Sequence, residues 1–167
     1  MAMLNMPVFN FFGTNVLWHK ATTLLGYFDV ALAASYGIVV LCELIKYRSF
    51  KKFDRSILLF LLFSLVVLVI YVILGKLPVN FRPLLDDGSL KPSYPSCHTL
   101  LSFGIICMIF AQVLKKFRPR RLKILCLLLL GAIMIFGSLG RLFSGDHWLT
   151  DIIAGLFLAM MIVSLYC

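Results

Sequence analysis

The residues from Arg141 to Asp151 place a cation, a histidine and a carboxylate close together between two apolar segments. His147 and Asp151 are four residues apart, so on a helix they share one face. An aspartate in that position can hold one imidazole nitrogen and leave the other free to attack an electrophile or to transfer a proton. Arg141 lies just upstream, across a turn marked by Gly145. This stretch therefore indicates nucleophilic or acid–base chemistry beside a cation.

A second histidine opens another apolar segment, in the sequence Pro95-Ser96-Cys97-His98. A Pro-Ser pair before an apolar run is typical of a helix start. The start of a helix offers unpaired N–H groups and a partial positive charge, which favour an anion. Taken alone, the stretch is better explained by a capping serine and an interfacial histidine.

Three cations, Lys76, Arg82 and Arg141, lie at the ends of apolar segments. Each could be an anchor whose charged end reaches the membrane surface. If the three meet beside His98 and His147, the arrangement favours a phosphate, whose oxygens match arginine in pairs. A metal held by the two histidines and an aspartate is the alternative. Three nearby cations make a divalent metal costly, so we expect a site without metal or other cofactor.

The composition is that of a membrane protein. Of the 167 residues 62% are hydrophobic, and the mean hydropathy is +1.01. A soluble domain of this size cannot bury that much apolar surface. The net charge of +9 does not indicate nucleic-acid binding, because five of the sixteen Lys and Arg residues lie in loop 46–55 and six in loop 115–123. The five cysteines have no pairing or metal-ligand spacing and are expected to be buried apolar residues.

Five apolar segments are long enough to cross a membrane as helices. They are residues 24–45, 56–75, 96–114, 124–140 and 148–166. Residues 1–20 are more polar and are interrupted by Pro7 and Gly13, so we expect an interfacial segment. The first span carries Asp29 and Glu43, and an acid within a membrane is a candidate functional residue. The prediction is an all-α transmembrane bundle in one domain, residues 1–167, with Asp29 as a possible neighbour of the site.

The basic loops predict the orientation of the chain in the membrane. Loops 46–55 and 115–123 should be cytoplasmic, because short loops rich in Lys and Arg stay inside. The three polar clusters then lie together on the extracytoplasmic side. Since this co-location follows from charge alone, it supports a single site at that membrane face.

In order along the chain, these clusters resemble the signature of the type 2 phosphatidic acid phosphatases. The signature appears here as Lys76…Arg82-Pro83, Pro95-Ser96-Cys97-His98 and Arg141-x5-His147-x3-Asp151. The resemblance covers most of the chain, and its third element is specific. It implies an α-helical membrane bundle that removes phosphate from a lipid.

The resemblance also implies a role for each residue. His147 would be the nucleophile that takes the phosphoryl group, Asp151 would orient and stabilise it, and His98 would protonate the leaving alcohol. Water would then hydrolyse the phosphohistidine. The phosphoryl oxygens would be held by Lys76, Arg82, Ser96 and Arg141, with backbone N–H groups near Cys97 and His98.

The chain departs from the family pattern at four points. Five residues separate Lys76 from Arg82, where the family usually has six. Cys97 stands where glycine is usual, and Gly140 stands where serine often precedes the arginine. The family commonly has six spans and this sequence predicts five, so residues 1–20 replace the first span or the natural chain has lost it.

The sequence therefore predicts a multi-pass lipid phosphatase of a bacterial cell membrane, acting at the outer leaflet. Its substrate would be a lipid phosphate or a polyprenyl diphosphate, such as phosphatidylglycerol phosphate, phosphatidic acid or undecaprenyl diphosphate. A non-catalytic binder or transporter of lipid phosphates is the alternative, because it would need the cations but not both histidines. A purely structural membrane protein would leave the three clusters unexplained.

Overall fold

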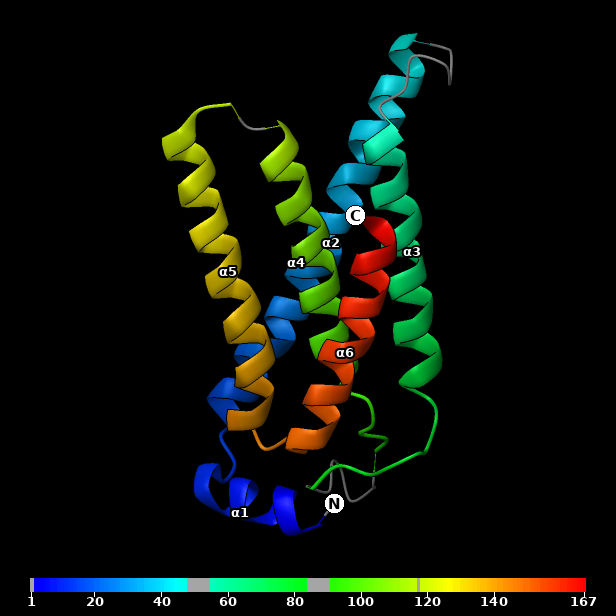
Figure 1. Cartoon of the computed structure of the whole chain (residues 1–167). Coiled ribbons are helices and arrows are strands. Elements are labelled where there is room, and N and C mark those ends of the chain that lie inside the picture. The colour runs from blue at the N-terminus through cyan, green and yellow to red at the C-terminus, as the bar shows by residue number, and fades with distance from the viewer. Residues whose placement is uncertain (1, 48–54, 84–90, 117) are drawn as a thin grey trace.

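The computed structural model of the chain describes residues 2–47, 55–83, 91–116 and 118–167 (Figure 1). The helices are α1 (Ala2–Phe12), α2 (Val16–Tyr47), α3 (Arg55–Leu74), α4 (Cys97–Lys116), α5 (Arg120–Phe143) and α6 (Leu149–Tyr166). Within the described ranges there is no strand, and only an isolated bridge joins Phe81 to Pro92. The predicted all-α fold is confirmed.

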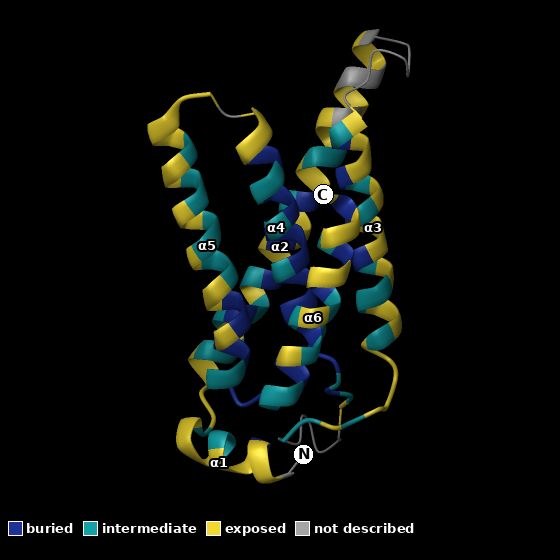
Figure 2. Ribbon diagram, in the orientation of Figure 1, coloured by how far each residue is buried: buried dark blue, intermediate teal, exposed yellow. Residues whose placement is uncertain are grey.

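Helices α2 to α6 are each long and apolar enough to cross a membrane. They leave many large apolar side chains exposed on the outside of the bundle, as Figure 2 shows for α3 and α5. Apolar surface on this scale requires a hydrocarbon environment. The chain is therefore a multi-pass membrane protein, as predicted. The first span begins earlier than expected, at Val16 rather than residue 24, and α5 extends beyond 124–140 at both ends.

The N-terminal residues form two elements rather than one interfacial segment. Helix α1 lies across one end of the bundle (Figure 1), and Pro7 lies inside it instead of breaking it. Pro7 is the sixth of the eleven residues of α1, so it removes one intrahelical hydrogen bond without ending the helix. The break comes at Gly13, whose φ of 64° favours glycine. The side chain of Asn15 then accepts the N–H groups of Leu17 and Trp18 at 2.9 and 3.3 Å, and so caps α2.

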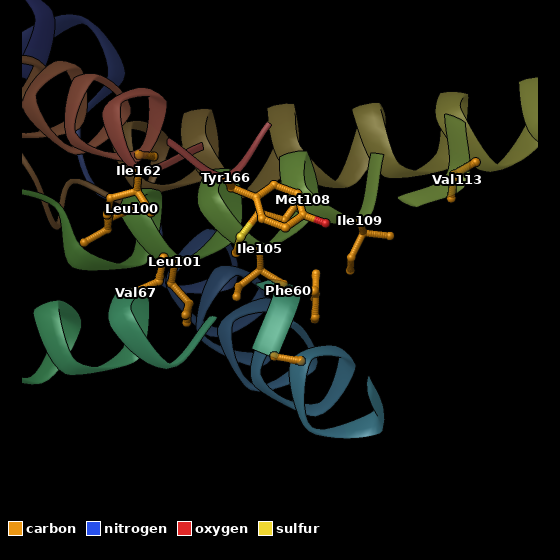
Figure 3. Close-up of a cluster of buried hydrophobic side chains, with 12 residues drawn as sticks. Phe60, Val67, Leu100, Leu101, Ile105, Met108, Ile109, Val113, Ile162 and Tyr166 are labelled. Carbon is orange, nitrogen blue, oxygen red and sulfur yellow. The ribbon is translucent and has the colours of Figure 1, made fainter. Parts of the chain in front are cut away.

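Helix α4 is the most buried of the five spans and packs against α2, α3, α5 and α6 (Figure 2). Its apolar side chains form the core with Phe60 of α3 and Tyr166 of α6, as Figure 3 shows. Gln112 is also buried, but its amide donates to the Ser56 carbonyl at 2.9 Å and to the Tyr166 hydroxyl. Because the amide of Gln112 is paired, this polar side chain does not prevent α4 from occupying the centre of the bundle.

The connections between the spans alternate between the two ends of the bundle. The end of α2, the start of α3, the end of α4 and the start of α5 lie at one end of the bundle, and the end of α3, the start of α4 and the α5–α6 connection lie at the other, next to α1 (Figure 1). The described residues of both predicted basic loops thus lie opposite the segments that carry the candidate site. Residues 48–54 and 117 of those loops, the expected turn at 86–88 and the side chain of Glu43 are outside the described residues.

Candidate active site

The starts of α4 and α6 are joined directly. The N–H of Ser96 donates to the carbonyl of Asp151 at 2.9 Å. Gly155 packs so closely against α4 that a Cβ there would lie 2.6 Å from the Ser96 carbonyl oxygen. His98, in the first turn of α4, and Asp151, in the first turn of α6, are therefore held at the same end of the bundle.

His147 and Asp151 are connected through a serine. The Nδ1 atom of His147 lies 4.0 Å from Asp151 Oδ2, which is too long for a hydrogen bond. The hydroxyl of Ser93 donates to Asp151 Oδ2 and lies 3.2 Å from His147 Nδ1, and the Ser93 carbonyl lies 3.0 Å from the same nitrogen. Because the hydroxyl proton is given to Asp151, both oxygens of Ser93 act as acceptors for the imidazole. Nδ1 must carry the proton, and Nε2 keeps a free lone pair.

The surroundings of His147 keep it neutral. Its side chain is 4% exposed, and burial together with the charges of Arg82 and Arg141 lowers its pKa to about 3. The nearby Asp146 and the hydrogen bond to Ser93 oppose this shift without reversing it. A neutral imidazole with a free Nε2 is the form that attacks an electrophile.

Arg82 and Arg141 meet at Asp146. Arg141 is 1% exposed and donates to Asp146 Oδ2 at 2.8 Å, while Arg82 lies 3.8 Å from Oδ1. Two more groups reach Oδ2: the Nδ1 atom of His19 at 2.7 Å and the hydroxyl of Ser144 at 2.8 Å. This carboxylate fixes the two guanidinium groups from α5 and the α3–α4 connection relative to each other.

The same contacts set the charge of Asp146. Burial raises its pKa, but the hydrogen bonds from His19 and Ser144 and the charge of Arg141 outweigh burial, so the pKa lies below its usual value. Asp146 is therefore ionised at neutral pH. It balances one of the two arginines and leaves the cluster with net positive charge.

Two cavities open at this cluster, one of about 310 Å³ and one of about 460 Å³. His98, Arg82 and Tyr71 border both cavities. The smaller one is also bordered by Lys76, Cys97 and His147, and the larger one by His19, Thr23, Tyr27 and Arg141. The predicted acid His98 therefore lies between the smaller cavity, which is bordered by the predicted nucleophile His147, and the larger cavity.

Three buried nitrogen atoms at the cavities have no hydrogen-bond partner in the described part of the chain. They are Nε of Arg82, Nε of Arg141 and Nε2 of His147. Buried polar groups are normally paired, so unpaired ones in a cavity indicate a missing ligand. Two N–H donors with positive charge and one lone pair suit a group with anionic oxygens around an electrophilic centre. Within the described ranges no three His, Cys, Asp or Glu side chains converge on a metal position.

A family comparison identifies this arrangement. The model of the PAP2 superfamily matches residues 74–167, more than half of the chain and all of the site residues predicted from the sequence. The chain belongs to the PAP2 superfamily. No curated protein sequence matches it. The predicted family is therefore confirmed, and so is a membrane phosphatase fold.

Two solved structures resemble the chain over almost its whole length. LpxE from Aquifex aeolicus has a TM-score of 0.51 and 21% identity, over 98% of this chain and 94% of that one. A transmembrane PAP2-type phosphatidylglycerolphosphate phosphatase from Bacillus subtilis has a TM-score of 0.52 and 20% identity, over 99% and 94%. At these identities the likeness supports the fold.

The structure brings most of the predicted PAP2 site residues together. Lys76, Arg82, Cys97, His98 and His147 border the smaller cavity, Arg141 borders the larger one, and Asp151 lies behind His147. Ser96 is different: its side chain is fully buried and its hydroxyl lies 2.9 Å from the Thr99 hydroxyl. Its hydroxyl does not border either cavity, and its N–H ties α4 to α6.

Sequence reasoning missed four residues of this PAP2 site. Ser93, His19 and Ser144 were not singled out, and Asp146 was counted only as a charge. Asp146 directly precedes the predicted nucleophile, so its position was the one available signal. Nothing in the sequence links His19 to this cluster, because it lies 127 residues away.

Proposed function

We propose that this PAP2 protein hydrolyses the terminal phosphate of a lipid phosphate or polyprenyl diphosphate through a phosphohistidine. The observation that carries the proposal is the set of unpaired buried atoms, Nε of Arg82, Nε of Arg141 and Nε2 of His147. Two of these atoms would donate to phosphoryl oxygens, and the third would attack the phosphorus. Lys76, which borders the smaller cavity together with Arg82 and His147, adds a third positive charge.

In the first step Nε2 of His147 forms a bond to phosphorus while the bond to the leaving oxygen breaks. His98 gives its proton to that oxygen. The imidazole of His147 becomes positively charged, and its Nδ1–H is held by Ser93, whose hydroxyl is bound to the Asp151 carboxylate. The negative charge of Asp151 thereby stabilises the intermediate through one intervening group.

In the second step a water oxygen forms a bond to phosphorus and the bond to His147 breaks. His98, now neutral, takes the proton of the attacking water. The products are a lipid alcohol or lipid phosphate and inorganic phosphate. Arg82 and Arg141 hold the phosphoryl oxygens in both steps, and Asp146 keeps the two guanidinium groups in place.

The surface next to the cavity supports a lipid substrate. A largely apolar groove of about 540 Å³ is bordered by Leu74, Pro95, Ile153 and Phe157, and Leu74 and Pro95 also border the cavity of His147. A hydrocarbon chain could lie in this groove while its phosphate faces the cations. One similar structure is described as a phosphatidylglycerolphosphate phosphatase, which agrees with this class.

Charge placement supports an extracytoplasmic site in the cell membrane. The described residues of the basic loops 46–55 and 115–123 lie at the opposite end of the bundle from the site. Because short basic loops remain in the cytoplasm, the site would face the outside.

The test is phosphate release in detergent with EDTA, from phosphatidic acid, phosphatidylglycerol phosphate and undecaprenyl diphosphate. His147→Ala should abolish release and also abolish an acid-labile phosphoryl label on the protein. His98→Asn should lower kcat by about 100- to 10,000-fold, the usual contribution of general acid catalysis. His147→Ala should still bind inorganic phosphate, which shows that the site is folded. Phosphate binding without turnover by the parent protein would instead favour a lipid-phosphate binder or transporter.

A further inference from the structure

Asp29 is a fully buried acid that the mechanism above does not use. It lies in α2, and its Oδ2 atom accepts a hydrogen bond from the Ser102 hydroxyl of α4. Its Oδ1 atom is buried and has no partner in the described part of the chain. An ionised carboxylate with a single hydroxyl partner is unfavourable within a membrane-spanning bundle. We therefore treat the resting group as a carboxylic acid, whose proton can be donated.

The position of Asp29 relates it to His98. Gly26 and Asp29 lie on one face of α2, and His98 and Ser102 lie on one face of α4. The two faces touch twice: a Cβ added to Gly26 would lie 3.6 Å from Nε2 of His98, and Ser102 bonds Asp29. The acid thus sits about one helical turn, roughly 5 Å along the helix axis, deeper than the imidazole.

A space beside this contact has room for water. The cavity of about 460 Å³ is bordered by Gly26 and Val30 on α2 and by His98 and Leu101 on α4. Asp29 precedes Val30 but is fully buried and does not itself border the cavity. A proton path from its carboxyl group to the imidazole therefore requires a water that enters from the cavity beside Gly26.

His98 needs a proton source because its charged surroundings are mainly positive. The charged and titratable groups that act on it are Arg141, His147, Arg82 and Asp146, and the Tyr71 ring packs against it. A proton added to the imidazole places another positive charge beside two arginines. An arriving phosphate offsets that charge, and a nearby acid can then transfer its proton.

We propose that Asp29, held by Ser102, stores the proton that His98 delivers to the leaving group. This inference rests on the proposed function. When the substrate binds, the Asp29 carboxyl proton moves through one water to the imidazole and leaves a carboxylate. The imidazolium passes a proton to the leaving oxygen as the P–O bond breaks. In the second step the proton of the attacking water returns through His98 to Asp29, so the cycle consumes no further proton donor.

The experiment compares two substrates in the full-length protein in detergent. An alkyl phosphate has a poor leaving group that requires protonation, whereas p-nitrophenyl phosphate has a good one that does not. Asp29→Asn keeps the size of the side chain and its ability to accept the Ser102 hydrogen bond, but it has no proton to donate. We expect kcat for the alkyl phosphate to fall by about tenfold or more and kcat for p-nitrophenyl phosphate to change less than about threefold. His98→Asn should show the same selective pattern, with a larger loss.

Two further variants complete the test. Ser102→Ala should show a smaller loss with the same substrate selectivity, because the acid remains but is no longer held. Ser64→Ala removes a different buried hydroxyl, on α3, and should leave both activities unchanged. The Kd for inorganic phosphate should match the parent in all of these variants, and each should unfold cooperatively. Ser102→Ala should be the less stable, because the buried Asp29 loses its hydroxyl partner.

The outcomes distinguish a failure of the Asp29 inference from a failure of the proposed function. Equal losses on both substrates in Asp29→Asn would show a structural role and overturn the inference, and so would unchanged kcat for the alkyl phosphate. If Asp29→Asn does not fold, the substrate selectivity of Ser102→Ala decides in the same way. A folded parent protein that releases phosphate from neither substrate would overturn the proposed function itself.

Discussion

Replacing Ser93 by alanine tests the connection between His147 and Asp151. The Ser93 hydroxyl donates to Asp151 Oδ2 and lies 3.2 Å from His147 Nδ1, whereas the direct distance between the two partners is 4.0 Å. Ser93→Ala removes the hydroxyl but keeps the backbone carbonyl, which lies 3.0 Å from Nδ1. The imidazole therefore keeps its orientation and its tautomer, and only its link to the carboxylate is lost.

The size of the effect follows from the bond that is removed. A hydrogen bond to a charged group contributes about 1.5–3 kcal/mol. If that energy is gained as the phosphohistidine forms and His147 becomes positive, kcat should fall by roughly 10- to 160-fold. KM should change little, because Arg82 and Arg141 still hold the phosphate. The loss should stay well below that of His147→Ala, in which no nucleophile remains.

The assay is single-turnover formation of the phosphohistidine, together with steady-state kcat and KM on the best lipid phosphate. Ser164→Ala is the matched control, because it removes an α6 hydroxyl that donates to the Met160 carbonyl of its own helix. A kcat for Ser93→Ala within about threefold of the parent would refute the reasoning. It would mean that Asp151 acts on His147 without the intervening serine.

The helices could be predicted because their signals are local. Twenty consecutive apolar residues specify a span whatever lies around them, and α3 was placed within one residue at each end, at Arg55–Leu74 against the predicted 56–75. The start of α2 was missed because the decisive signal is the side chain of Asn15, a cap within a stretch of mixed polarity. Pro7 was expected to interrupt the N-terminal segment, but it lies inside α1. A proline removes one hydrogen bond of a helix and does not always end it.

The site was predictable as far as its residues lie in local motifs. His147 and Asp151 share a motif, and His98 opens a helix. The groups that connect these residues come from elsewhere: Ser93 lies 54 residues before His147, and His19 lies 127 residues before Asp146. Only the packing of α2, α4 and α6 brings them together. The sequence analysis also assigned Lys76, Arg82 and Arg141 to the phosphate, although Asp146 already pairs with the two arginines.

Three further predictions test the packing, the nucleophile and the internal anion of the site. Gly155→Ala should destabilise the protein by about 1–3 kcal/mol in detergent unfolding, because its Cβ would lie 2.6 Å from the Ser96 carbonyl oxygen. Gly131→Ala, whose Cβ would lie 3.7 Å from Phe110, is the control and should be nearly neutral. Because the pKa of His147 is lowered to about 3, the imidazole stays neutral as the pH falls. The rate of phosphohistidine formation should then not show the roughly 25-fold loss between pH 7 and pH 5 that protonation of a nucleophile with a pKa of 6.5 would cause. Asp146→Asn should strengthen the binding of inorganic phosphate, measured as its inhibition constant, by about five- to tenfold. The variant removes one negative charge about 7 Å from a dianion, which contributes on the order of 1 kcal/mol even at the dielectric constant of water. The asparagine oxygen can still accept the 2.8 Å bond from Arg141, so the guanidinium should stay in place. Weaker phosphate binding would instead show that the charge of Asp146 is needed to hold the arginines, and that its repulsion of the ligand is the smaller effect.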